Sequence, residues 1–176
     1  MAQRKPTEQP NESVPSHSFE RRREKVQNNT ADAPSKESVQ LERTIQKDIP
    51  EVTAQAKAYL RPKNKNDYGE LICQCCHEKM PFKLKSGDHY FVAVQCVKDQ
   101  EKRHYQNRLA LCPTCAAMYK HSRETDDPEI LRLIVEHDAP DDAPSVEIPV
   151  VLAGKQHSLR FVGTHWFDLK TVFENS

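Results

Sequence analysis

The sequence predicts an α+β fold in which one folded domain follows a disordered N-terminal arm. Only 36% of the 176 residues are hydrophobic and 30% are charged. A chain this polar cannot bury a core along its whole length. Six cysteines lie close together in the middle of the sequence, and segments with helical or strand-like patterns surround them. These observations place the domain at residues 50–176 and the arm at residues 1–49.

The arm contains few large apolar side chains, and four prolines interrupt them. This composition is typical of a disordered segment. The Arg21-Arg22-Arg23 run is flanked by Glu20 and Glu24, which favours a solvated charged segment over a nucleic-acid site. A short helix over residues 37–47 is the one element predicted there.

The domain is expected to begin with a helix over residues 50–60. Pro50 suits the first position of a helix, and Pro62 with the polar residues after it is expected to end the helix. One face of this helix is apolar and wide enough to dock on a core. That face consists of Val52, Ala56, Tyr59 and Leu60.

The middle of the domain is expected to contain two strands and a helix. A turn at Gly87-Asp88 precedes a strand over residues 90–97, and residues 109–111 extend into the next cysteine pair. Residues 116–121 have the composition of a helix.

The C-terminal part is expected to contain a hairpin and a helix over about residues 146–174. The apolar run at residues 128–135 fits either a helix or a strand. Strands at 146–152 and 157–162 flank a predicted turn at 153–156. Thr164 is expected to cap a last helix. The buried face of that helix would contain Trp166, Leu169 and Phe173.

Four of the six cysteines form two C-x2-C pairs, Cys73 with Cys76 and Cys112 with Cys115. A two-residue turn presents both sulfurs of a pair to one point, and two pairs complete a tetrahedral zinc site without an open position. Such a closed site stabilises a fold and performs no chemistry. The sequence therefore predicts structural Zn²⁺ bound by these four thiolates, in preference to an iron–sulfur cluster or no metal.

The other two cysteines are not predicted ligands. Cys75 could join the set only as an awkward C-x-C or adjacent pair, and Cys96 follows an apolar stretch that favours a packed thiol.

The order of elements around the two pairs predicts a treble clef over about residues 71–121. In that arrangement a knuckle and a hairpin precede a helix whose first turn supplies the last two ligands. The start of a helix suits thiolates, because its free N–H groups and its dipole favour negative charge.

Residues 71–121 resemble the HNH family of nucleases in their cysteine-bearing form. In that family a C-x2-C knuckle precedes a strand that ends in a paired histidine motif, and an Asn followed by Leu-Cys-Pro-x-Cys-His completes the pattern. The run from Phe91 to Val97 stands at the strand, and the run from Asn107 to Ala116 stands at the second half.

The departures from the family pattern fall on its chemistry. The paired motif reads Gln95-Cys96, and Ala116 stands where the family commonly has His or Asn. Gln95 is a poor metal ligand, and neither residue of the pair is a usual base for activating water. Asn107 alone would at most orient a partner. The resemblance therefore implies a retained scaffold without the catalytic set, and no catalytic residue is predicted.

The distribution of charge suggests where a partner binds. Residues 60–124 carry 12 Lys and Arg against 7 Asp and Glu, whereas residues 125–176 carry 4 against 10. The basic section would attract an anionic partner such as nucleic acid. The candidate contact residues are Lys83, Lys85, Lys102, Arg103, Arg108 and Lys120.

Two alternatives to nucleic-acid binding stay open. The zinc could hold a surface that docks a protein partner through the acidic C-terminal section. Alternatively, a metal-dependent nuclease site could be rebuilt from His89, His104 or His121.

The cellular location is inferred from the first residues and from the length of the apolar runs. The first residues precede no apolar stretch of the kind found in a secretory signal, and no apolar run approaches the ~20 residues that span a bilayer. We therefore expect a cytoplasmic protein with no membrane partner, in a reducing compartment where thiolates hold metal.

Overall fold

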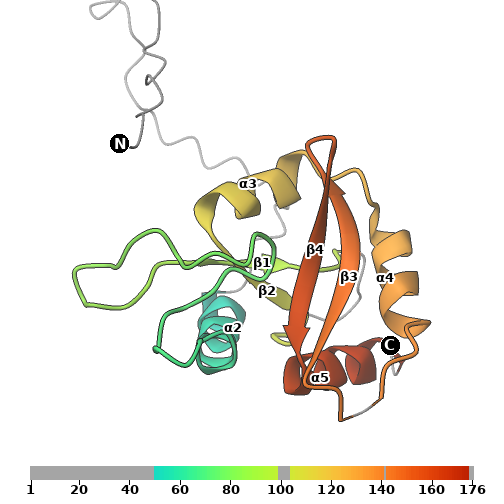
Figure 1. Cartoon of the computed structure of the whole chain (residues 1–176), viewed down its shortest axis with the longest axis horizontal. Coiled ribbons are helices and arrows are strands. Elements are labelled where there is room, and N and C mark those ends of the chain that lie inside the picture. The colour runs from blue at the N-terminus through green and yellow to red at the C-terminus, as the bar shows by residue number, and fades with distance from the viewer. Residues whose placement is uncertain (1–49, 99–103, 141, 175–176) are drawn as a thin grey trace, which may run out of the picture. The chain divides into compact units, whose positions relative to one another are not determined.

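The computed structural model describes residues 50–98, 104–140 and 142–174 (Figure 1). The predicted arm, its short helix and its arginine run lie outside these residues. Within the described ranges the α+β prediction is confirmed. The elements are α2 (Pro50–Lys63), β1 (Val92–Gln95), β2 (Arg108–Leu111), α3 (Pro113–His121), α4 (Asp127–Val135), β3 (Ser145–Leu152), β4 (Lys155–Val162) and α5 (Gly163–Glu174).

The first helix, α2, uses the predicted face, with Ala56 and Leu60 fully buried. It does not end where the sequence suggested, because Pro62 lies inside its last turn. Asn64 closes the helix instead. Both the backbone N–H and the side-chain amide of Asn64 donate to the carbonyl of Leu60, at 3.1 and 2.9 Å.

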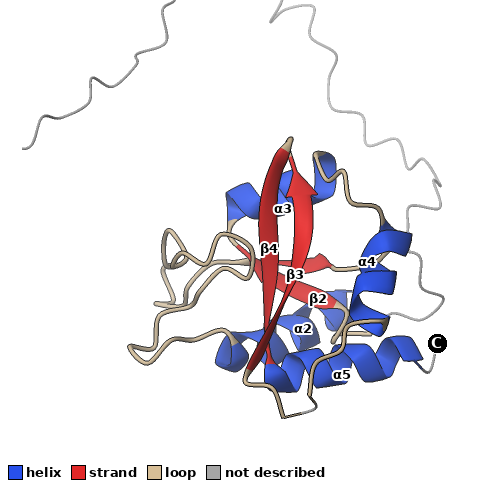
Figure 2. Cartoon of the chain, turned by 45° about the vertical axis from the view of Figure 1, so that its right-hand side comes forward, coloured by secondary structure: helices blue, strands red, loops and turns tan. Residues whose placement is uncertain are grey.

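The strands β1 and β2 form a short antiparallel hairpin in which Val92 pairs with Leu111 and Gln95 with Arg108. The hairpin lies between α3 and α2, as Figures 1 and 2 both show. All four residues of β2 are therefore buried. The strand is shorter than the predicted 90–97, since only four residues of the first segment pair with β2.

The strands β3 and β4 form the predicted C-terminal hairpin, and α4 and α5 pack against it (Figure 2). Alternate side chains of the hairpin enter the core. These are Val146, Ile148, Val150, Leu152, Leu159 and Phe161.

The turn of this hairpin is shorter than predicted. Lys155 already pairs with Leu152, so only Ala153 and Gly154 connect the strands. Both have left-handed backbones, with φ of 50° and 71°. Positive φ at both central residues is what a two-residue hairpin turn requires, because its twist then matches that of the strands.

Residues 128–135, whose sequence fitted either a helix or a strand, belong to helix α4. Asp126 caps α4, and its Oδ1 accepts a hydrogen bond of 2.8 Å from the backbone N–H of Glu129. Pro128, two positions after the cap, also suits the start of a helix.

The last helix, α5, buries the predicted face of Trp166, Leu169 and Phe173. It begins at Gly163, so Thr164 lies within its first turn and is not its cap. The Thr164 hydroxyl instead accepts a hydrogen bond from Nζ of Lys63 at 2.9 Å. None of the described helices combines the length and the apolar composition needed to cross a membrane.

Candidate metal centre

The four predicted ligands meet at one point. The sulfurs of Cys73, Cys76, Cys112 and Cys115 all lie within 4.8 Å of one another. Sulfurs at tetrahedral corners around a metal with bonds of about 2.3 Å are about 3.8 Å apart. The spacing therefore fits a single metal ion held by four sulfurs.

The first knuckle is a tight turn closed by backbone hydrogen bonds. The N–H of His77 donates to the carbonyl of Cys73 at 3.1 Å, and the N–H of Cys73 donates to the carbonyl of Glu78 at 2.9 Å. His77 has φ of 61°, which reverses the chain after the second ligand of the pair. This geometry turns Cys73 and Cys76 toward the same point.

The second knuckle is the start of α3. Cys112 is the N-cap of this helix, and its sulfur accepts from the N–H of Cys115 at 3.4 Å. The N–H of Cys112 donates to the sulfur of Cys73 at 3.3 Å. Backbone donors thus face the sulfurs, and they would stabilise the negative charge of thiolates in a metal site.

The four thiols lie partly inside the protein, with Cys73 and Cys115 buried. A hydrogen bond with Cys115, together with burial, raises the pKa of Cys73 well above that of an ordinary thiol. Burial also raises the pKa of the Cys76 thiol to about 11. Without a cation, several thiolates would therefore not coexist here at neutral pH, whereas a divalent ion would offset their charge.

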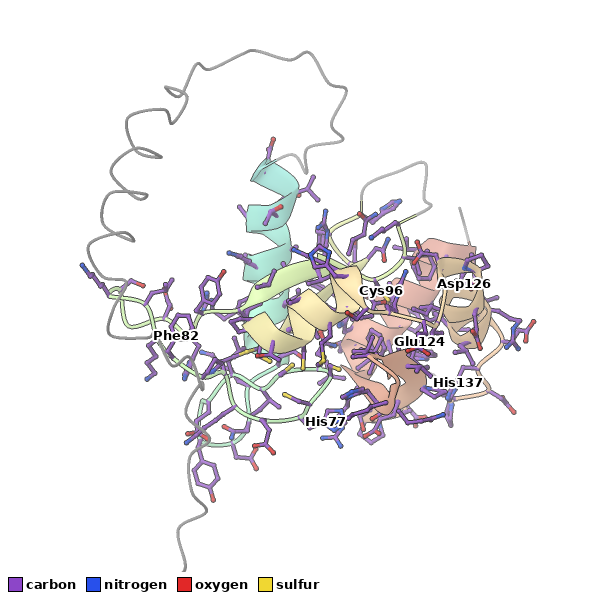
Figure 3. The ribbon with its side chains drawn as sticks, turned by 90° about the horizontal axis from the view of Figure 1, so that it is seen from above. His77, Phe82, Cys96, Glu124, Asp126 and His137 are labelled. Carbon is purple, nitrogen blue, oxygen red and sulfur yellow. The ribbon has the colours of Figure 1, made fainter. Side chains whose placement is uncertain are left out.

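The two remaining cysteines are not members of the cluster, as the sequence suggested, although the Cys75 side chain hydrogen-bonds to Cys115. Cys96 is fully buried, and burial raises the pKa of its thiol to about 12. It lies in the interior near the end of α3 (Figure 3). Its carbonyl accepts hydrogen bonds from the Tyr119 hydroxyl at 2.7 Å and from Nη1 of Arg123 at 3.1 Å. Cys75 is buried as well.

The residue that fixes the first knuckle to the rest of the fold is Gln74, which sequence reasoning missed. Its backbone N–H donates to the carbonyl of Ala110 at 3.0 Å, and its Oε1 accepts from the N–H of Ala110 at 2.8 Å. Its side-chain amide donates to the carbonyl of Arg160 at 2.8 Å. No sequence signal marks a buried glutamine between two cysteines, because its partners Ala110 and Arg160 come from distant segments.

Asn107 has a structural role in the fold. Its amide oxygen accepts from the N–H of Val97 at 3.0 Å, and its amide nitrogen donates to the carbonyl of Val97 at 2.7 Å. Both ends of the side chain are thereby engaged in closing the loop that connects β1 to β2.

The predicted nucleic-acid residues fall into three groups. Lys83 and Lys85 lie on an exposed loop between the first knuckle and β1. Arg108 and Lys120 come together at a hollow between the β1–β2 hairpin and α3. Lys102 and Arg103 lie outside the described residues.

The hollow at this hairpin has a basic lining, and no carboxylate is among the described residues that form it. The lining consists of Ala93, Val94, Gln95, Lys98, Arg108, Lys120 and His121. Lys98, Lys120 and His121 are exposed, whereas Arg108 is buried. Among the residues that the structure describes, Lys98 and Lys120 form no ion pair.

The three histidines considered for a rebuilt nuclease site are on different segments. His89 is on the loop before β1, His104 precedes β2, and His121 ends α3. In the described ranges, the four cysteines are the only group of three or more His, Cys, Asp or Glu side chains close enough to share a metal ion.

No protein-family model, curated protein or solved structure matches the chain.

Proposed function

We propose that the chain is a non-catalytic module of treble-clef, HNH-like form, held together by structural zinc, that binds nucleic acid. The observation that carries the binding part is the basic hollow beside β1. Exposed Lys98, which follows β1, and exposed Lys120 on α3 both line it, and none of the described lining residues is a carboxylate. Phosphate groups are the anions that such a surface would neutralise.

Zinc is the metal that best fits the centre. Four thiolates are soft ligands, and a closed tetrahedral set of sulfurs is typical of structural zinc. The N-cap position of Cys112 and the helix that follows it correspond to the ligand-bearing helix of a treble clef. Elemental analysis of the purified full chain by mass spectrometry tests this assignment. Zinc at one ion per chain is expected, whereas iron with visible absorbance would contradict it.

The positions that correspond to the HNH catalytic set support a binding role over cleavage. Gln95 borders the hollow, but Cys96 and Ala116 are buried. A buried thiol whose pKa is raised to about 12 offers no base at neutral pH. The hollow would therefore hold phosphates without activating water.

Binding can be tested by fluorescence anisotropy with a labelled nucleic acid over a range of salt concentrations. Affinity should fall steeply as salt increases, because each neutralised phosphate releases counterions. The double variant Lys98→Gln/Lys120→Gln should flatten the slope of log affinity against log salt by about 2. Lys155→Gln, at the exposed hairpin turn, is the matched control. Affinity that does not depend on salt would contradict the proposal.

A nuclease remains the second candidate, because His121 lines the same hollow. Incubation of the zinc-loaded protein with plasmid and Mg²⁺ or Mn²⁺ decides between the two. Cleavage that is lost in His121→Ala and retained in His89→Ala would favour the nuclease. Binding without cleavage in all three proteins supports the non-catalytic module.

A further inference from the structure

A loop over residues 80–90, the projecting loop, extends away from the rest of the described fold (Figures 1 and 3). Its backbone is held by hydrogen bonds across its two arms. The N–H of Leu84 donates to the carbonyl of Asp88 at 2.7 Å, and that of Tyr90 donates to the carbonyl of Phe82 at 3.1 Å. Gly87, with φ of 89°, makes the turn at the tip. The loop is therefore a defined hairpin-like structure.

Helix α2 supports the base of the projecting loop. Nη1 of Arg61 donates to the carbonyl of His89 at 3.2 Å and lies 3.6 Å from a carboxylate oxygen of Asp88. The Arg61 guanidinium also lies over the ring of the buried Phe91, at 5.3 Å from its centroid. These contacts fix the direction in which the loop projects.

The projecting loop presents an aromatic pair to solvent. The rings of Phe82 and Tyr90 are stacked, with centroids 5.1 Å apart and planes inclined by 9°. Phe82 is 50% exposed, and Leu84 near the tip is also exposed. Phe82 contributes little to the core, since residues 81–88 are all exposed, whereas Tyr90 is half-buried at the base of the loop. A flat, half-exposed ring on a fixed loop is suited to stacking against another planar group.

The charges beside this pair are mainly positive. Lys83 and Lys85 alternate with the exposed apolar side chains, and neither forms an ion pair with a described residue. Nζ of Lys57 lies 6.0 Å from the centroid of the Tyr90 ring. The one carboxylate of the projecting loop, Asp88, faces Arg61. The loop thus combines stacking surface with unpaired cations.

We infer that the projecting loop binds single-stranded nucleic acid, with a base stacked on Phe82 and flanking phosphates contacted by Lys83 and Lys85. An unpaired base exposes its ring face, whereas a base inside a duplex does not. Phe82 offers the ring for one base, and the lysines on either side of Leu84 are placed to contact the phosphates that flank it. The inference rests on the proposed nucleic-acid function and adds a second contact surface and a preference for unpaired strands.

The variant Phe82→Trp in the zinc-loaded full chain provides a direct measurement. The native Trp166 is buried, so a new exposed tryptophan would report stacking through quenching of its fluorescence. We expect quenching by oligothymidine or oligouridine of about 16 nucleotides and little quenching by a duplex of the same length. The DNA and RNA arms show which strand chemistry binds more tightly.

Substitution separates stacking from simple apolar contact. Phe82→Ala should weaken single-strand affinity at least about fivefold and leave duplex affinity unchanged. Phe82→Leu should behave like Phe82→Ala, because it keeps the apolar bulk without a planar ring. Phe167→Ala on α5 removes a phenylalanine of similar exposure, 49%, and should leave both affinities unchanged.

The outcomes distinguish this inference from the proposed function. One outcome is that the wild type binds duplex and single strands with equal affinity and that Phe82→Ala has the same affinities as Phe167→Ala. This outcome would overturn the role of the projecting loop and leave the basic hollow in place. Wild-type affinity in Phe82→Leu would overturn stacking in the same way. Failure of the wild type to bind either probe would overturn both proposals.

Discussion

Nε2 of Gln74 lies 3.4 Å from Nδ1 of His165, which joins the first metal knuckle to the last helix across 91 positions of sequence. The His165 ring is fully buried, and its Nε2 lies 3.0 Å from the carbonyl of Gln106. A neutral ring with its proton on Nε2 satisfies both contacts, since Nδ1 then accepts from the Gln74 amide. The knuckle is thereby connected to the C-terminal part of the fold independently of the metal.

Replacing Gln74 should destabilise the protein although it binds no metal. Gln74→Ala removes the side-chain hydrogen bonds to Ala110, Arg160 and His165. It also leaves buried groups without partners, so we expect the free energy of unfolding to fall by about 2–4 kcal/mol. Urea denaturation of the full chain measures this.

The exposed Gln156 on β4 is the control for Gln74. Gln156→Ala should change the free energy of unfolding by less than about 0.5 kcal/mol. Equal effects of the two substitutions would show that the Gln74 contacts do not stabilise the fold.

Acid should destabilise the protein through His165. Burial lowers its pKa from 6.5 to about 4. Between these values the unfolded state binds a proton that the native state does not. The free energy of unfolding should therefore fall as pH decreases from about 6.5 to about 4, by about 3 kcal/mol in total for this group.

Other groups, including the metal ligands, also respond to acid, so the His165 contribution is isolated by comparison with His165→Gln. Glutamine offers an acceptor and a donor but does not titrate in this range. Denaturation curves at several pH values should show a steeper loss of stability in the wild type. If the free energy of unfolding falls in parallel with pH in the two proteins, His165 is not the source of the acid sensitivity.

Removing one of the four clustered cysteines should unfold the domain. Cys112→Ser removes one sulfur of the cluster but keeps a side chain that can cap α3, so its effect reports the metal site and not the cap. Because the binding free energy of a structural metal contributes directly to folding, we expect loss of metal and of the cooperative thermal transition. Circular dichroism and elemental analysis follow the two losses.

Cys96→Ala provides the contrast for Cys112→Ser. It removes a thiol that is more deeply buried than that of Cys112 and lies outside the cluster, and it should cost only about 1–2 kcal/mol, with the metal retained. Metal content that falls equally in both variants would contradict the assignment of four ligands.

Gly163, the first residue of α5, should tolerate no side chain. A Cβ at this position would lie 2.1 Å from the carbonyl oxygen of Ala143. Since the Gly163 N–H also donates to the carbonyl of Pro144 at 2.9 Å, the loop cannot move away without breaking that bond. Gly163→Ala should lower the free energy of unfolding by about 1–3 kcal/mol, measured by chemical denaturation.

The neighbouring Thr164→Ala is the control for Gly163→Ala. It removes only the exposed hydrogen bond with Lys63, so its cost should be below about 0.5 kcal/mol. A loss of about 1 kcal/mol would instead match a helix cap and contradict the start of α5 at Gly163.

The sequence by itself determined the local features of this protein. The two C-x2-C pairs predicted a cluster of four sulfurs, because that spacing turns both thiols of a pair to one side of a tight turn. Apolar periodicity predicted the buried faces of α2 and α5 and the C-terminal hairpin. Within each cysteine pair and each element these features depend on residues a few positions apart, whereas only folding brought the two pairs together.

Only the tertiary structure decided what depends on contacts between distant segments. Gln74 gained its role because Ala110, Arg160 and His165 surround it. The apolar run at residues 128–135, which fitted either state, became a helix that packs against α5 and β3. Lys98 and Lys120 share a hollow because α3 packs beside β1. Composition predicted a basic section, but folding determined which of its cations lie together and which aromatic rings face solvent.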